Sequence, residues 1–153
     1  MTKKVYFDMD GTIANLYAVD KWLENIHNEV ENMYKNLEPM VDMNLLQTIC
    51  KDLQMVGYKI GVITWLPPGR KEYREKIAKE KREWLARYMP IVEEIHIQEY
   101  MTPKQTAITT ITGRMILVDD NEEVRNKWNT PVQRKSIDAT NNMIEELKKL
   151  LDI

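Results

Sequence analysis

The sequence predicts an α/β fold, in which a mostly parallel β-sheet lies between layers of helices. Short apolar runs alternate along the chain with longer segments whose apolar residues recur every three or four positions. This alternation is typical of strands joined by crossover helices. The chain has 153 residues, of which 43% are hydrophobic, and it shows no linker or repeat. We therefore expect one domain over residues 1–153.

The predicted strands are short apolar runs that end in polar residues. Val5–Phe7 is followed by Asp8, and Lys59–Thr64 is followed within three residues by Pro67. Three weaker runs predict further strands, at Ile95–Ile97, Met115–Val118 and Pro131–Ile137. Runs without apolar–polar alternation are typical of strands that are buried on both faces.

The predicted helices follow from apolar spacings of three and four. Ile13 to about Val41 has this pattern and predicts two helices or one broken helix. Further helices are expected over Leu45–Val56, Arg70–Tyr88 and Met143–Leu151, and others start near Pro103 and Asn121. In the segment starting at Thr102, we expect Thr102 as the N-cap and Gln105 as its capping-box partner, which places Lys104 in the first helical turn.

Composition excludes several classes of protein. No apolar run is long enough to cross a membrane, and the formal net charge of −2 gives no electrostatic reason for stable nucleic-acid binding. The single cysteine, Cys50, excludes an internal disulfide, and Asp8 interrupts the apolar run that a signal peptide would need. We expect a soluble, cytoplasmic protein. The sequence leaves its oligomeric state open.

Residues with reactive side chains follow the predicted strands. Ligands of open parallel sheets bind at the carboxyl ends of the strands, so these positions are the most informative. They hold two acids after the first strand, a hydroxyl after the second and two acids after the fourth: Asp8, Asp10, Thr64, Asp119 and Asp120. Each has a simpler explanation as a turn, a helix cap or a solvated residue, but their joint occurrence at strand ends favours one site.

Together with Lys104, this ordered set resembles the four motifs of the haloacid dehalogenase (HAD) superfamily. The first motif is Asp8-Met9-Asp10-Gly11-Thr12, and the resemblance extends to about Asn121. It implies a Rossmann-like three-layer sandwich, with a small helical cap inserted after the first motif at about 14–42. It also implies phosphatase or phosphotransferase chemistry, because Asp10 stands where dehalogenases lack a second aspartate.

The resemblance also implies a role for each motif residue. Asp8 is the expected nucleophile, which forms an aspartyl-phosphate, and Asp10 is the general acid and then the base. Asp8, the carbonyl of Asp10, Asp119 and Asp120 are the expected Mg²⁺ ligands, with Asp120 binding directly or through water. Thr64, Lys104 and the backbone near Gly11 are expected to hold the phosphoryl oxygens.

Within the superfamily, the sequence looks most like the 5′(3′)-deoxyribonucleotidases. It departs from them where Trp65 follows Thr64 in place of a small hydroxyl residue. The expected substrate is a nucleoside monophosphate, whose base could stack on Trp65 or Tyr17, whereas Trp22 is expected in the core. Two alternatives remain open: a phosphatase of sugar phosphates or other small metabolites, and a binding module without turnover.

Other chemical candidates have weaker support. Glu24 with His27 and Glu93 with His96 have a spacing found in di-iron helical bundles, but His96 lies in a strand pattern. Cys50 is expected to be a small core residue. The segment Arg70–Arg87 carries eight basic and four acidic residues, and we expect these to form a solvated face. An electrostatic guide for phosphorylated substrates is the alternative for that segment.

Overall fold

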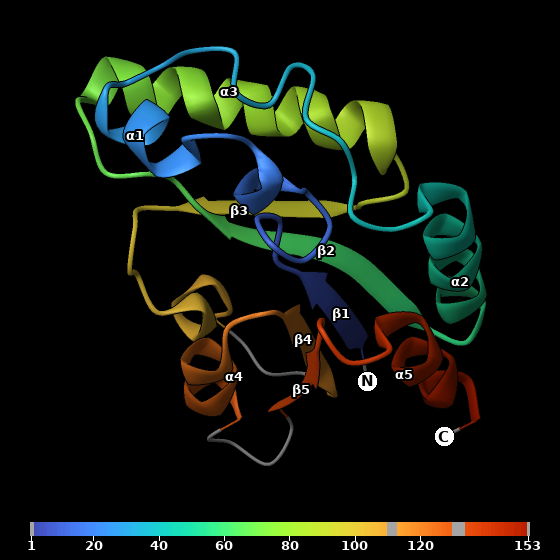
Figure 1. Cartoon of the computed structure of the whole chain (residues 1–153). Coiled ribbons are helices and arrows are strands. Elements are labelled where there is room, and N and C mark those ends of the chain that lie inside the picture. The colour runs from blue at the N-terminus through green and yellow to red at the C-terminus, as the bar shows by residue number, and fades with distance from the viewer. Residues whose placement is uncertain (1, 110–112, 130–133, 153) are drawn as a thin grey trace.

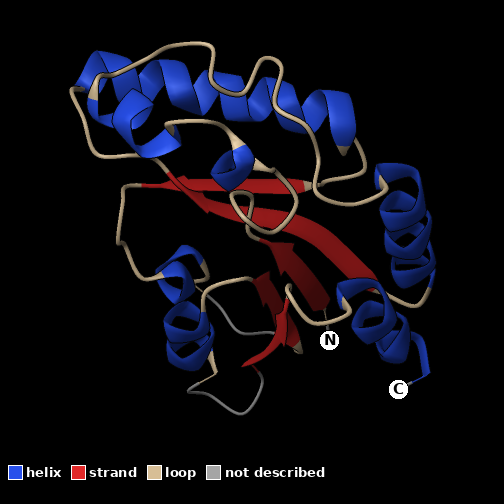
Figure 2. Cartoon of the chain, in the orientation of Figure 1, coloured by secondary structure: helices blue, strands red, loops and turns tan. Residues whose placement is uncertain are grey.

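A computed structural model describes residues 2–109, 113–129 and 134–152 of the chain. Its centre is a parallel sheet of five strands in the order β3-β2-β1-β4-β5 (Figures 1 and 2). The strands are β1 (Lys3–Phe7), β2 (Tyr58–Trp65), β3 (Glu94–Gln98), β4 (Met115–Asp119) and β5 (Arg134–Asp138). The predicted α/β fold is confirmed. The strand predicted over Pro131–Ile137 is confirmed from Arg134 onward, and residues 131–133 lie outside the described part.

In the described part of the chain, five α-helices and three 3₁₀ turns lie between the strands or follow the last one. The α-helices are α1 (Trp22–His27), α2 (Met43–Met55), α3 (Lys71–Tyr88), α4 (Glu122–Trp128) and α5 (Met143–Lys149). The 3₁₀ turns are η1 (Leu16–Ala18), η2 (Lys104–Ala107) and η3 (Leu150–Asp152). Within the described residues, no helix is both long and apolar enough to span a membrane.

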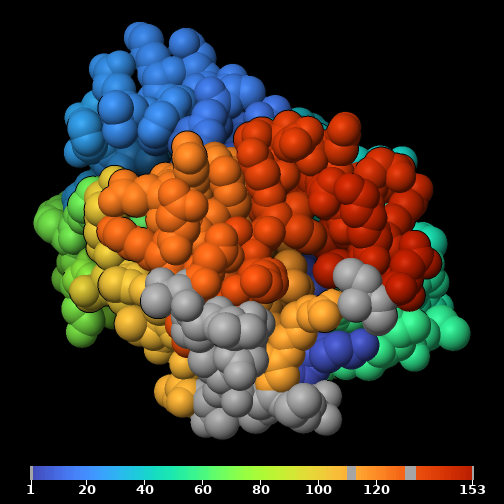
Figure 3. All heavy atoms as spheres, turned by 90° about the horizontal axis from the view of Figure 1, so that it is seen from below, coloured from blue at the N-terminus to red at the C-terminus, as the bar shows by residue number. Residues whose placement is uncertain are grey.

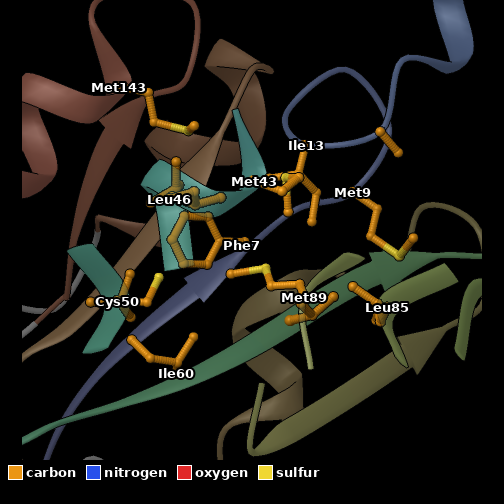
Figure 4. Packing of buried hydrophobic residues seen from close by; sticks show 14 of the residues in the cluster. Phe7, Met9, Ile13, Met43, Leu46, Cys50, Ile60, Leu85, Met89 and Met143 are labelled. Atoms are coloured by element: carbon orange, nitrogen blue, oxygen red, sulfur yellow. The ribbon is translucent and has the colours of Figure 1, made fainter. Parts of the chain in front are cut away.

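The two faces of the sheet bury different sets of side chains. Val5 and Phe7 of β1 belong to the larger core, with residues of α2, α3 and α5. Figure 4 shows Phe7 close to Leu46 of α2. Tyr6 points to the opposite face, where it belongs to a smaller cluster with Trp128 of α4. This alternation along β1 makes the protein a three-layer α/β/α structure.

The segment 14–42 departs from the predicted helical pattern. It contains only η1 and the six-residue α1 in regular helical form, and the rest is irregular. Lys21, Glu29 and Asn32 have φ values of 56°, 52° and 63°, which an α-helix does not tolerate. The apolar spacing instead reflects contacts of a folded loop with the core. In Figure 3, the light-blue atoms of this segment stand out at the top of the view, whereas the dark-blue start of the chain lies near the bottom.

The predicted α-helix with a capping box near Pro103 is wrong. The segment forms the 3₁₀ turn η2, whose cap position is Pro103, and no side chain caps it. Thr102 and Gln105 therefore do not form the expected reciprocal pair. Lys104 is nevertheless the first residue of this turn, and it is 3% exposed.

Candidate active site

The acidic residues after β1 and β4 meet because these two strands are neighbours in the sheet. Their carboxyl ends lie at the same edge, as in other parallel sheets. Asp8 follows β1 directly, Asp119 ends β4, and both side chains are buried. Thr64 of β2 lies on the other side of β1 and is also buried. The fold thus brings together the carboxylates and the hydroxyl that the sequence placed at strand ends.

Lys104 connects the two buried carboxylates. Its Nζ donates to Oδ1 of Asp8 at 2.8 Å and to Oδ2 of Asp119 at 2.7 Å. Burial alone would lower the pKa of this ammonium, but the two carboxylates outweigh it and raise the pKa above its ordinary value. Lys104 therefore stays charged at neutral pH and offsets part of the negative charge on the acids.

Asp8, Asp119 and Asp120 form the one group of three potential metal ligands found among the described residues. Their ligand atoms lie within 4.8 Å of one another. Burial and the nearby Asp8 raise the pKa of Asp119 to about 6 and that of Asp120 to about 7. Such crowding of carboxylates in a buried place is costly without a cation. The all-oxygen donor set fits a hard divalent ion such as Mg²⁺.

Asp10 has different partners from Asp8. Its Oδ1 accepts a hydrogen bond of 2.7 Å from the hydroxyl of Tyr34, and its Oδ2 lies 3.1 Å from Nζ of Lys81. The Asp10 side chain is 19% exposed, and it lines the same cavity as Asp8. Burial and the Asp10 carboxylate raise the pKa of Tyr34 well above its ordinary value, so this hydroxyl remains a donor.

Lys81 and Tyr34 are site residues that the sequence analysis missed. Lys81 is fully buried, whereas we expected it on the solvated face of the charged helix. A signal for it existed: Lys81 lies four residues after Ile77 and four before Leu85, so it interrupts the apolar stripe of α3. Tyr34 lies in irregular backbone, where periodicity gives no signal.

Gly11 allows the backbone to pass close to the acidic cluster. Its φ is +82°, and a Cβ there would lie 2.4 Å from Oδ2 of Asp120. Its N–H donates to the carbonyl of Ala14 at 3.0 Å, so this amide already has an acceptor. Thr12, named by the sequence only as part of the first motif, donates to Oδ2 of Asp8 at 3.0 Å. Gly11 thus allows the backbone to lie close to Asp120, and Thr12 donates a hydrogen bond to Asp8.

A cavity of about 300 Å³ opens from the acids toward the segment after β1. Aromatic side chains line it beyond the carboxylates: Tyr17, Trp22, Trp65 and Tyr100. Tyr17 packs edge-to-face on Trp22, and Trp65 packs edge-to-face on Tyr100. Trp22, expected in the core, is partly buried against the core and also lines this cavity. Nε1 of Trp65 donates to the carbonyl of Thr102 at 2.7 Å.

The two histidines and Cys50 were the remaining candidates for chemical roles. His96 lies in β3 and pairs with Glu94 at 2.8 Å, and His27 ends α1 near the cavity. Neither histidine belongs to a group of three potential metal ligands among the described residues, so the two Glu–His pairs do not form a di-iron site. Cys50 is buried in the core, and burial raises the pKa of its thiol to about 12. It is therefore a packing residue, as expected.

Comparisons with known proteins agree with the predicted fold. No protein-family model and no curated protein matches the chain. Among solved structures, a chain of the Pnkp1/Rnl/Hen1 complex has a TM-score of 0.58 at 17% identity, over 91% of this chain and 45% of that one. The present chain thus spans less than half of that protein's length.

A second solved structure matches over its whole length. The D,D-heptose 1,7-bisphosphate phosphatase from Burkholderia thailandensis has a TM-score of 0.52 at 11% identity, over 99% of this chain and 100% of its own. The HAD domain of effector protein Lem4 from Legionella pneumophila has a TM-score of 0.48 at 15% identity, covering 98% and 93%. At such identities, the likeness to the first two shows a shared fold. The Rossmann-like α/β fold is therefore confirmed.

Proposed function

We propose that the chain is a Mg²⁺-dependent phosphomonoesterase of the HAD superfamily, and that its substrates are nucleoside monophosphates. The observation that carries this proposal is the bridge from Lys104 to Asp8 and Asp119, with Asp120 beside them. A carboxylate can attack a phosphate dianion only where positive charge offsets their repulsion. The Lys104 ammonium supplies one such charge, and Mg²⁺, when bound, would supply the rest.

Asp8 and Asp10 have different roles in the proposed reaction. A carboxylate oxygen of Asp8 attacks phosphorus, the bond to the leaving oxygen breaks, and Asp10 donates its proton to that oxygen. Water then attacks the phosphorus of the aspartyl-phosphate, Asp10 takes a proton from that water, and the bond between phosphorus and Asp8 breaks to release inorganic phosphate. Thr64 and Lys104 are the proposed donors to the phosphoryl oxygens. Asp10 is assigned this role because its side chain lines the same cavity as Asp8 and lies outside the group of potential metal ligands.

The aromatic lining of the cavity supports a nucleoside as the leaving group. With the phosphate at Asp8, the rest of the substrate extends along the cavity past Trp65 and Tyr17. A planar base can stack on such rings, whereas a sugar phosphate gains less from them. The cytoplasmic location expected from the sequence is consistent with a nucleotide substrate and remains a prediction.

A substrate panel tests the proposal. Purified protein with Mg²⁺ is assayed first on p-nitrophenyl phosphate, and then on nucleoside monophosphates and glucose 6-phosphate. We expect turnover of the aryl ester and a higher kcat/KM for nucleoside monophosphates than for the sugar phosphate. Preference for the sugar phosphate would reassign the substrate, and no turnover of any ester would favour a binding module.

A further inference from the structure

Lys81 carries a positive charge into the interior beside the site. Its side chain is 0% exposed, and it reaches the carboxyl ends of the strands from α3. Its Nζ donates to Thr64 Oγ1 at 2.7 Å, to the carbonyl of Trp65 at 2.6 Å and to Asp10 Oδ2 at 3.1 Å. A buried ammonium is costly unless it is paired and hydrogen-bonded, and this one has three acceptors.

These contacts exclude Lys81 as a direct phosphate ligand in this arrangement. An ammonium has three N–H donors and no acceptor, and three acceptors already surround it. Lys104, in contrast, contacts the nucleophile directly. The two lysines therefore have separate tasks, and that of Lys81 is exerted through Asp10.

Asp10 is held at both of its carboxylate oxygens. Lys81 binds Oδ2 and Tyr34 binds Oδ1, and α3 positions both partners. The residue before Lys81, Glu80, accepts the backbone N–H of Tyr34 at 3.1 Å. Two donors on opposite oxygens fix the rotation of a carboxyl group more tightly than one does. Asp10 is thus tethered to α3, and through Lys81 to β2, and its side chain is not one of the potential metal ligands.

We propose that Lys81 is a positioning residue that orients Asp10 to protonate the leaving oxygen. This inference rests on the proposed phosphomonoesterase function. It predicts an effect that depends on the leaving group. An alkoxide must be protonated as it departs, whereas p-nitrophenolate leaves readily without a proton. Loss of Lys81 should therefore impair the transfer of phosphate to Asp8 from alkyl esters far more than from p-nitrophenyl phosphate.

The test compares Lys81→Met with wild type by rapid quench, measuring phosphorylation of Asp8 by each ester. For a nucleoside monophosphate, we expect the rate to fall about ten- to a hundredfold, within the range of general acid catalysis. For p-nitrophenyl phosphate, we expect a change of less than about threefold, seen as a retained burst of p-nitrophenol. Both phosphorylation rates are measured on the same preparation of the variant. Their ratio therefore does not depend on the fraction of protein that is folded.

Lys79→Met is the matched control, because Lys79 lies on the same helix with its side chain 79% exposed. It should leave both rates unchanged. Equal losses of Lys81→Met on the two esters, or no loss on either, would overturn the role of Lys81 while the proposed function stood. If the wild type phosphorylated Asp8 with neither ester, the proposed function would fail, and the role of Lys81 with it.

Discussion

Asp8 and Asp10 are separated by one residue, yet their carboxylates bind different lysines. Asp8 accepts from Lys104 at 2.8 Å, and Asp10 lies 3.1 Å from Nζ of Lys81. Asp8 belongs to the group of potential metal ligands, and the side chain of Asp10 does not. The two carboxylates therefore have different surroundings. In the proposed mechanism Asp8 is the nucleophile and Asp10 transfers the proton.

Asp8→Asn should abolish turnover. An amide is a far poorer nucleophile than a carboxylate, and the change also removes a charge from the metal-ligand group. We expect kcat below about one thousandth of the wild-type value in a steady-state phosphatase assay. The far-UV circular dichroism spectrum should be unchanged. Activity well above this level in a folded variant would rule out Asp8 as the nucleophile.

Removal of the metal should stop the reaction. We expect no turnover after exhaustive chelation and recovery on addition of Mg²⁺. Ca²⁺ should inhibit, because its larger and looser coordination shell displaces the nucleophile from phosphorus. A steady-state assay with each ion added back to the chelated protein measures this. Undiminished activity in the chelated protein would contradict the proposed role of the acidic group.

The stability of the metal-free protein should fall as pH rises. The pKa values of Asp119 and Asp120 are raised to about 6 and 7 in the folded state, so that state holds more protons than the unfolded chain. Their stabilising contribution is complete below about pH 4 and is lost as pH rises through 7. We expect a loss of about 1 to 2 kcal/mol, allowing for solvent screening at Asp120, or about 2 to 8 °C in Tm.

Thermal melts across this pH range, with and without Mg²⁺, check that prediction. Other groups also titrate between pH 4 and 8, so Asp120→Asn is the control, and its curve should be flatter than that of the wild type. Mg²⁺ should stabilise the protein more at pH 8 than at pH 5, because binding displaces the protons. An equal effect of Mg²⁺ at both pH values would contradict the raised pKa values.

Gly11→Ala should remove activity out of proportion to its effect on stability. The new Cβ would approach Oδ2 of Asp120 to 2.4 Å and would force an L side chain into positive φ. Gly57→Ala is a matched control, since Gly57 has a φ of +101° and its Cβ would meet only Lys3, at 3.5 Å. Gly57→Ala should lose about 1 to 2 kcal/mol in chemical unfolding from its positive φ, and Gly11→Ala should lose at least as much. Only Gly11→Ala should lose kcat, and equal kcat in the two would refute the role of Gly11.

Trp65→Ala should raise KM for nucleoside monophosphates about ten- to a hundredfold, since stacking is worth about 1 to 3 kcal/mol per base. Its KM for p-nitrophenyl phosphate should change less. Trp65 also donates to the carbonyl of Thr102, so Trp65→Phe is the control that keeps a ring but loses this bond. Equal losses of Trp65→Ala on both substrates would show that Trp65 positions Thr64 and Lys104 and does not bind the base.

The sequence predicted the strand ends of the site because buried parallel strands leave a clear apolar signal. Asp8, Thr64 and Asp119 each follow or end such a run, and neighbouring strands bring them together. Lys81 was missed because eight basic residues in Arg70–Arg87 made a solvated face the simplest interpretation. Its position in the apolar stripe of α3 was the available signal.

The segment 14–42 shows where periodicity misleads. Its apolar residues recur at helical spacing, but the backbone turns at Lys21, Glu29 and Asn32, which adopt positive φ. Tertiary contacts decided the local structure: Tyr34 bonds to Asp10, and its N–H bonds to Glu80 of α3. Contacts between segments so distant in sequence cannot be predicted from local patterns.

The most direct test of the proposed mechanism is to trap the phosphorylated protein. Wild-type protein is mixed with Mg²⁺ and a nucleoside monophosphate, quenched in acid within one turnover, and mapped by peptide mass spectrometry. We predict one phosphoryl group on the peptide that contains Asp8, and none in Asp8→Asn treated in the same way. Turnover of the ester by the wild type with no phosphoryl group on that peptide, or with one on another residue, would contradict covalent catalysis by Asp8.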